Sequence, residues 1–298
     1  MRSCFSLSNG LEIPCIGYGT YPLKEDLIEC AGKAYDTGYR LFDTSDNYEN
    51  EQYLGEALDR IKGRDNGDAS NIIVISKFSQ AFRTHELEQC FEESLDKLRG
   101  KLDIYLLHWP YPYLWEQQWK KMEKLYQAGR CRAIGVCNFE VPKLRRLLKI
   151  CEIKPMVNQI ERHPTFQQSE IADFCRRNGI QVMSYSPIAR KNEKLFGDER
   201  LKGVAERYDK SIGQIVLKWN LQEDSIPIPG SRSEKHIIEN ISIDDFVLKD
   251  EDMKILDSME CGNRIRFAPE KRFSLKEKNE MLIYRTKRSV KKVLGIKK

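Results

Sequence analysis

Residues 38–51 read GYRLFDTSDNYENE, a short apolar run that ends in an aspartate and is followed by a polar turn with a tyrosine. The next residues, from Glu51 to Arg60, have the pattern of a helix. Considered alone, the segment is explained just as well by Asp43 as a helix N-cap and Tyr48 as a half-exposed turn residue. If the pattern recurs, it instead predicts strands that deliver polar side chains to the loops behind them.

The pattern does recur in the next two apolar runs. The segments NIIVISK and LDIYLLH end in Lys77 and His108. A buried lysine beside a carboxylate can hold a tyrosine hydroxyl at a lowered pKa, and a nearby histidine can orient a polarised carbonyl group. We therefore predict a catalytic group in which Tyr48 donates a proton, Asp43 holds Lys77, and Lys77 lowers the pKa of Tyr48.

Five motifs of the chain resemble the aldo-keto reductase family and occur in the same order. They are GYRLFDTSDNYENEQYLG, VISK, LLHWP, IGVCNF and VNQIERHP. The similarity extends from about Leu7 to about Asn240, and the first motif alone fixes many positions over eighteen residues. The resemblance implies reduction of a carbonyl compound with a nicotinamide cofactor.

Length and composition fit one soluble enzyme domain. The 298 residues are within the range of single α/β barrels, and 40% hydrophobic with 32% charged residues is typical of globular proteins. There is no run of 18 apolar residues and no secretory signal, and the nine cysteines are scattered without metal-ligand spacing. We expect a cytoplasmic monomer without a metal site and without nucleic-acid binding.

The chain from Lys24 onward repeats a helix, a turn and an apolar strand. Strands are predicted near 16–20, 39–43, 71–77, 102–107, 131–137, 155–160, 180–185 and 225–229. Helices are predicted near 24–37, 49–62, 84–99, 115–129, 140–150, 167–178, 199–222 with a break near Asp209, and 233–241. Helical connections make the strands parallel, and eight of them close economically into a barrel. A doubly wound open sheet is the alternative, although it is normally shorter.

The fold class is thus α/β, a (β/α)8 TIM barrel over residues 1–266. An N-terminal β-hairpin closed by Asn9-Gly10 precedes the first barrel strand, and the resemblance implies that it plugs the barrel floor. Residues 267–298 are assigned to a C-terminal extension. Its last part, 285–298, has seven basic residues and no acidic one, so the rest of the chain sums to −2. We expect this basic tail to be a solvated terminus, with a weakly amphipathic helix on acidic lipid or nucleic acid as the alternative.

Barrel enzymes place their sites at the carboxyl ends of the strands. The resemblance implies that Asn138 and Gln159 hydrogen-bond the nicotinamide carboxamide and that Tyr185 stacks on its ring. Taken singly, Asn138 could cap the helix at 140–150, and the other two could be core residues. The expected cofactor contacts are Gly19, Thr20, Tyr21, Asp43, Cys137, Asn138, Gln159, Tyr185, Ser186, Pro187, Ser231, Arg232, Ser233, Glu239 and Asn240.

The expected cofactor is NADPH, with NADH as an open alternative. The family usually has a lysine after the proline of the last segment and an arginine six residues on, where this chain has Gly230 and His236. Arg232 remains, and a guanidinium can bind a phosphate in bidentate fashion. The resemblance implies that Glu239 and Asn240 contact the adenine.

Short loops with aromatic side chains predict an open substrate pocket. Its expected walls are Tyr21, Phe78, Trp109 and Tyr111, which favour broad acceptance of aldehydes and small ketones. A nucleotide-binding regulatory or scaffold subunit on the same fold is the alternative function. The complete catalytic group favours an enzyme, because a scaffold has no need of a proton donor.

Overall fold

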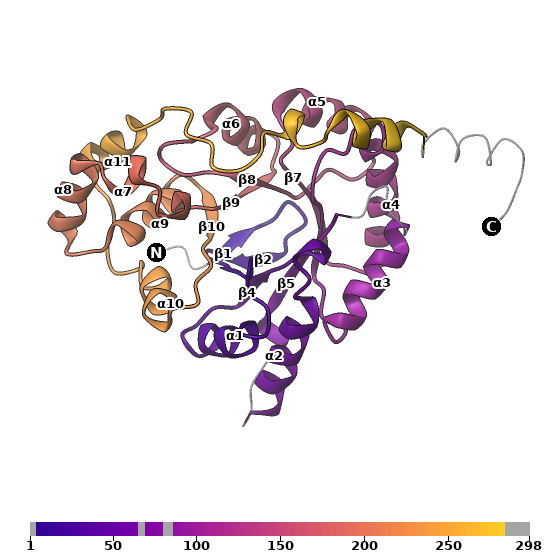
Figure 1. Ribbon diagram of the computed structural model, residues 1–298, viewed down its shortest axis with the longest axis horizontal. Helices are drawn as coiled ribbons and strands as arrows, with labels where there is room; N and C mark the ends of the chain where they lie inside the picture. The colour runs from indigo at the N-terminus through magenta and orange to yellow at the C-terminus, as the bar shows by residue number, and fades with distance from the viewer. Residues whose placement is uncertain (1–3, 65–68, 80–85, 284–298) are drawn as a thin grey trace, which may run out of the picture.

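The structure is a computed structural model that describes residues 4–64, 69–79 and 86–283 of the chain. Its centre is one sheet of eight parallel strands, each paired with its neighbours in chain order, with the helices around the outside (Figure 1). The strands are β3 (Tyr18–Gly19), β4 (Leu41–Asp43), β5 (Ile73–Phe78), β6 (Ile104–Leu107), β7 (Ala133–Cys137), β8 (Val157–Glu161), β9 (Gln181–Tyr185) and β10 (Ser225–Ile228).

Backbone contacts between the first and last strand segments close the sheet into a barrel. Gly17 N donates to Pro227 O at 3.0 Å, and Gly19 N donates to Pro229 O at 2.9 Å. The strands read as continuous buried runs because the barrel interior lies on one side and the helices on the other. The predicted (β/α)8 barrel is confirmed, and the open-sheet alternative is excluded.

Nine helices of the described chain follow the predicted alternation within a few residues. They are α1 (Leu27–Asp36), α2 (Glu51–Gly63), α3 (Leu87–Lys97), α4 (Trp115–Gln127), α5 (Val141–Ile150), α6 (Ser169–Arg177), α8 (Glu199–Tyr208), α9 (Ile212–Gln222) and α10 (Glu234–Ile241). The predicted break is real: Asp209 is left-handed with φ 51°, and Ser211 forms a capping box with Gln214 that begins α9. The sequence did not predict α7 (Glu193–Phe196) or α11 (Asp250–Asp257).

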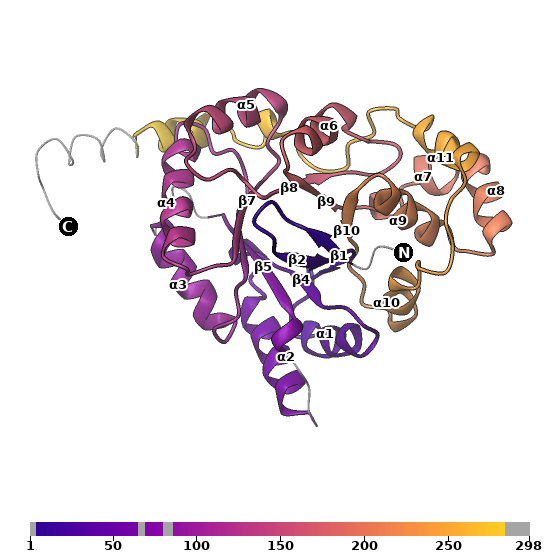
Figure 2. The same cartoon turned by 180° about the vertical axis from the view of Figure 1, so that it is seen from behind.

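The N-terminal hairpin consists of β1 (Cys4–Ser6) and β2 (Glu12–Pro14), which pair in antiparallel fashion. Its turn uses Gly10 with a φ of 83°, a conformation that favours glycine. Phe5 and Ile13 are buried, and the view from behind shows the hairpin at the centre of the ring of strands (Figure 2). The hairpin therefore covers one end of the barrel, as expected.

The chain beyond residue 266 packs on the barrel. Phe273 and Met281 are buried, and the Phe273 ring lies 5.3 Å from the ring of Tyr111. Residues 275–283 are helical. The basic tail at 285–298 lies outside the described residues. Within the described part of the chain, no helix has both the length and the apolar character needed to cross a membrane.

Replacement of Gly230 by alanine is expected to destabilise the barrel closure. A Cβ at this position would lie 2.4 Å from the carbonyl oxygen of Gly19, so the strand ends must move apart. The free energy of unfolding should fall by about 1–3 kcal/mol, the usual cost of overpacking, in a urea titration. Gly63→Ala is the control, because its Cβ meets nothing within 4 Å, and its stability should not fall. An unchanged free energy of unfolding in Gly230→Ala would contradict the close approach of Gly230 to the carbonyl oxygen of Gly19.

Candidate active site

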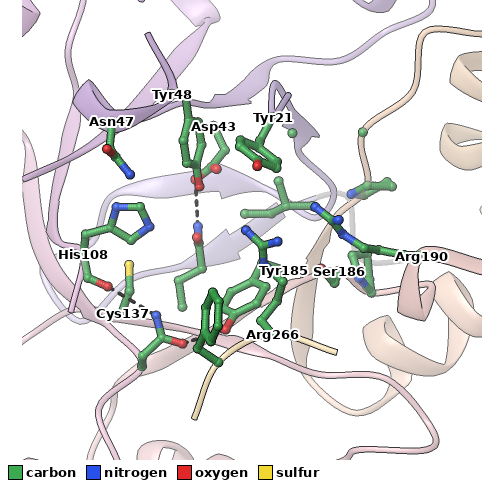
Figure 3. A pocket seen from close by; sticks show the side chains of 18 of the residues that line it. Tyr21, Asp43, Asn47, Tyr48, His108, Cys137, Tyr185, Ser186, Arg190 and Arg266 are labelled. Carbon is green, nitrogen blue, oxygen red and sulfur yellow. Dashed lines mark hydrogen bonds between the residues drawn. The ribbon is translucent and has the colours of Figure 1, made fainter. Parts of the chain in front are cut away.

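A cavity of about 370 Å³ opens at the carboxyl ends of the barrel strands (Figure 3). It is lined by twelve of the residues predicted from the sequence, which lie at or just after the ends of β3, β4, β6, β7, β8 and β9. They are Gly19, Tyr21, Asp43, Tyr48, His108, Trp109, Cys137, Asn138, Gln159, Tyr185, Ser186 and Pro187. The strand ends therefore converge on one site.

Lys77 connects the predicted catalytic residues from behind the cavity wall. Its side chain is fully buried, and its Nζ donates to Asp43 Oδ1 at 2.6 Å and to the carbonyl oxygen of Thr44 at 2.8 Å. The same Nζ lies 3.3 Å from the hydroxyl of Tyr48, which belongs to the short 3-10 turn Asp46–Tyr48 after β4. A buried cation thus links a carboxylate to a phenol that faces the cavity.

The electrostatics of this group differ from the sequence expectation at Tyr48. Burial raises the pKa of Tyr48, and Lys77 opposes that shift without reversing it, so the pKa lies above its ordinary value rather than below it. Burial by itself lowers the pKa of Lys77, but the attraction of Asp43 and of Tyr48 outweighs burial and raises it. At neutral pH the pair is therefore a charged lysine beside a protonated phenol.

His108 follows β6 directly and faces Tyr48, with 5.8 Å between the ring centroids. Its Nδ1 lies 2.6 Å from Ser79 Oγ and 3.2 Å from Ser45 Oγ, and these two hydroxyls fix the ring. Burial lowers the pKa of His108 well below its usual value, and the positive charges of Lys77, Arg272 and Arg266 lower it further. The imidazole is therefore neutral at physiological pH.

The two amides and the tyrosine of the predicted nicotinamide site form one network. Tyr185 donates its hydroxyl to Asn138 Oδ1 at 2.8 Å, Asn138 Nδ2 donates to the carbonyl oxygen of His108 at 3.2 Å, and Gln159 Nε2 donates to Asp43 Oδ2 at 2.7 Å. Asn138 has a left-handed φ of 62°, and the N-cap of α5 is Glu140 instead. The alternative of Asn138 as a helix cap is therefore wrong.

Three residues predicted for the site lie outside the cavity lining as the structure describes it. Phe78 and Tyr111 are buried against each other, with 6.4 Å between ring centroids, so the structure does not place them on the pocket wall. Phe78 follows Lys77 on β5 and points to the opposite face of the strand. Thr20 is buried and donates its hydroxyl to the carbonyl oxygen of Asp43.

The segment predicted for the ribose end of the cofactor also lies beyond the cavity lining. Arg232 is largely exposed and its Nε pairs with Asp26 at 2.5 Å, while Ser233 N donates to Ser231 Oγ. His236 contacts Glu239 through Nδ1 at 2.9 Å. Gly230 is the residue of this segment that lines the cavity, together with Ile228 and Pro229 before it. Asn240 is buried on α10.

Several lining residues were missed by sequence reasoning. Asn47 directly precedes Tyr48, and three arginines, Arg190, Arg266 and Arg272, come from loops or from the chain beyond the barrel. Basic residues beside aromatic ones at 264–273 are the feature that could have indicated them. Among the described residues, no group of three or more His, Cys, Asp or Glu side chains is suited to hold a metal ion.

Comparison with known proteins agrees with this geometry. The Aldo/keto reductase family model matches residues 15–260. Glyoxal reductase of Bacillus subtilis (strain 168) is 38% identical, over 91% of this chain and 97% of that protein. Methylglyoxal reductase DkgA of Yersinia pestis is 34% identical, over 91% of this chain and 97% of that protein.

A solved structure of a Bombyx mori aldo-keto reductase in complex with NADP superposes on the chain with a TM-score of 0.82 and 28% identity. The match covers 90% of this chain and 95% of the silkworm protein. Fold, motifs and family model thus agree over most of the sequence. The chain belongs to the aldo/keto reductase family of oxidoreductases, which use NAD(P)H as their cofactor.

Proposed function

We propose that the protein reduces aldehydes and small ketones to alcohols with NADPH, and that Tyr48 is the proton donor. The observation that carries the proposal is the contact of Tyr48 with the buried Lys77–Asp43 pair, at the wall of a cavity that the neutral His108 also faces. A scaffold that only binds nucleotide has no need of a buried cation beside a phenol. The glyoxal and methylglyoxal reductases among the relatives support a small carbonyl substrate.

The residues of the site suit the cofactor and the reaction. The amides of Asn138 and Gln159 line the cavity beside the ring of Tyr185, as a planar carboxamide-bearing ring requires. When bound, the reduced nicotinamide supplies a hydride to the carbonyl carbon. Tyr48 gives its hydroxyl proton to the carbonyl oxygen, and Lys77 stabilises the phenolate that remains. The neutral His108 orients the carbonyl as a hydrogen-bond partner.

The proposal includes a cytoplasmic, monomeric protein. None of the nine cysteines, all of them in the described part of the chain, forms a disulfide bond, as is usual in a reducing compartment. Burial raises the pKa of the Cys137 thiol in the cavity, so this side chain stays protonated and is no nucleophile.

The first prediction concerns the proton donor. Tyr48→Phe removes the hydroxyl and keeps the ring that packs 5.1 Å from Tyr21, so carbonyl reduction should fall by at least about a hundredfold, the lower range for general acid catalysis. The dissociation constant for NADPH, measured by fluorescence titration, should stay within about twofold. Undiminished turnover in this variant would exclude Tyr48 as the donor.

The second prediction concerns cofactor choice. NADPH should bind more tightly than NADH, and Arg232→Ala should remove most of the difference, since a charge-assisted contact with the 2′-phosphate contributes about 1.5–3 kcal/mol, or roughly ten- to a hundredfold in affinity. Arg232 is free to turn from Asp26 because both side chains are well exposed. Arg146→Gln, an exposed residue of α5 outside the cavity lining, is the control. Equal binding of both nucleotides by the unaltered protein would reject the prediction.

The third prediction concerns the protonation state of His108. A lowered pKa favours the neutral ring at every pH above it, so His108 should remain neutral at pH 6, where an unperturbed histidine with a pKa of about 6.5 is mostly charged. Nitrogen-15 NMR of the imidazole can measure this, with the protein unfolded in urea as the reference. A protonated His108 ring at pH 6 would contradict its role as a neutral partner of the carbonyl.

A further inference from the structure

The cavity carries an excess of positive charge. Its described lining includes three arginines, Arg190, Arg266 and Arg272, against a single carboxylate, Asp43, which already pairs with Lys77. Within the described part of the chain, none of the three guanidinium groups has a carboxylate or hydrogen-bond partner. Arg190 is exposed, but Arg266 and Arg272 are half-buried, and half-buried cations without a counter-ion are costly, which points to a missing anion.

Arg266 is held over the site by a buried acid of the barrel. Glu161 ends β8 and is fully buried, and it accepts backbone N–H groups from Ile265 at 2.5 Å and from Arg266 at 2.8 Å. The guanidinium carbon of Arg266 lies 5.3 Å from the ring centre of Tyr21, and the side chain extends into the cavity (Figure 3). The carboxylate at the strand end therefore fixes where this charge sits.

Arg272 approaches from the same C-terminal segment. Its guanidinium carbon lies 5.7 Å from the ring centre of Trp109, and its neighbour Phe273 is buried against Tyr111. The buried Phe273 ring therefore holds the backbone next to Arg272, and the contacts with Glu161 hold the backbone at Arg266. Both arginines are thus positioned by buried contacts.

These two charges lie beside the reacting groups. The ring of Tyr21 is 5.1 Å from that of Tyr48, and the ring of Trp109 is stacked 6.0 Å from that of His108. The ring of Tyr21 therefore separates Arg266 from Tyr48, and the ring of Trp109 separates Arg272 from His108. The guanidinium carbon of Arg190, from the segment after β9, also lies 5.7 Å from the ring centre of Tyr21, but this side chain is exposed. The two half-buried arginines of the C-terminal segment are therefore the ones that we assign to the substrate.

We propose that the substrate is a carbonyl compound that also bears an anionic group, a carboxylate or a phosphate, and that Arg266 and Arg272 bind this anion. This specificity rests on the reductase function proposed above. A guanidinium binds either anion with paired N–H donors, and stacking on Tyr21 and Trp109 leaves the edges of both groups available. The anion holds the far end of the substrate while its carbonyl lies between Tyr48 and His108.

Steady-state kinetics with matched substrate pairs test the site. The first pair is 4-carboxybenzaldehyde and its methyl ester, and the second is glyceraldehyde 3-phosphate and glyceraldehyde, so the two pairs distinguish carboxylate from phosphate. The anionic member of at least one pair should have a kcat/KM about tenfold or more above that of the neutral member. Equal values within both pairs would overturn the proposal.

Two variants and a control locate the effect. Arg266→Gln and Arg272→Gln should each lower kcat/KM for the favoured anion about tenfold more than for the neutral member of its pair, mainly through KM, and leave the dissociation constant of NADPH unchanged. Arg146→Gln, at an exposed position outside the cavity lining, should change none of these values. If anion preference survives both variants, or if NADPH binding weakens in them, the arginines do not form a substrate site.

Binding of a non-reacting anion separates this inference from the reductase proposal. Calorimetric titration with 4-(hydroxymethyl)benzoate in the presence of NADPH, which cannot reduce an alcohol, should show binding that Arg266→Gln weakens. No turnover of any aldehyde together with intact, arginine-dependent binding would reject the reductase function and keep the anion site. Turnover of an aldehyde without arginine-dependent binding would reject the anion site and keep the reductase function.

Discussion

A buried lysine is the constraint on which the rest of the site depends. Transfer of the Lys77 ammonium into a barrel interior costs several kcal/mol unless every donor is satisfied. Here Asp43, Thr44 and Tyr48 surround its Nζ, and the other oxygen of Asp43 accepts from Gln159. Removal of any one partner leaves charge or hydrogen-bonding capacity uncompensated. The arrangement therefore tolerates few alternatives, which keeps Tyr48, the proton donor of our proposal, in place.

The same network explains why the site is rigid across the barrel. It begins on β4 with Asp43, runs through Lys77 on β5 and Gln159 on β8, and a second branch joins Tyr185 on β9 to Asn138 after β7. Each bond connects residues far apart in the sequence, at the ends of parallel strands. The closed barrel holds those ends in register, so the positions of Asp43, Lys77 and Gln159 follow from backbone pairing, and the short turn after β4 adds Tyr48 to them.

Sequence periodicity was enough to predict the strands and the residues at their ends. It also contained information that was not used: Phe78 comes one residue after Lys77, and the alternation of side chains along a strand places the two on opposite faces. The loops could not be predicted in the same way. Arg190 and its neighbours Ala189 and Lys191 adopt positive φ, and Arg266 is placed by a contact with Glu161 more than a hundred residues earlier. Neither the positive φ angles nor the long-range contact with Glu161 can be read from the residues next to them in the sequence.

The strand ends and the loops differ in how freely their side chains can be replaced. Because the strand-end groups satisfy one another, a substitution there disturbs a buried charge and affects every reaction that the barrel supports. The C-terminal segment around Arg266 and Arg272 takes no part in these hydrogen bonds around the buried charge. Its contacts with Glu161 and through Phe273 fix the backbone and leave the side chains of the two arginines to vary. Charge at the cavity mouth can therefore change without breaking the hydrogen bonds of the catalytic group. We expect substrate selectivity to depend on side chains of this kind, where the backbone is held by the barrel and the side chain is not.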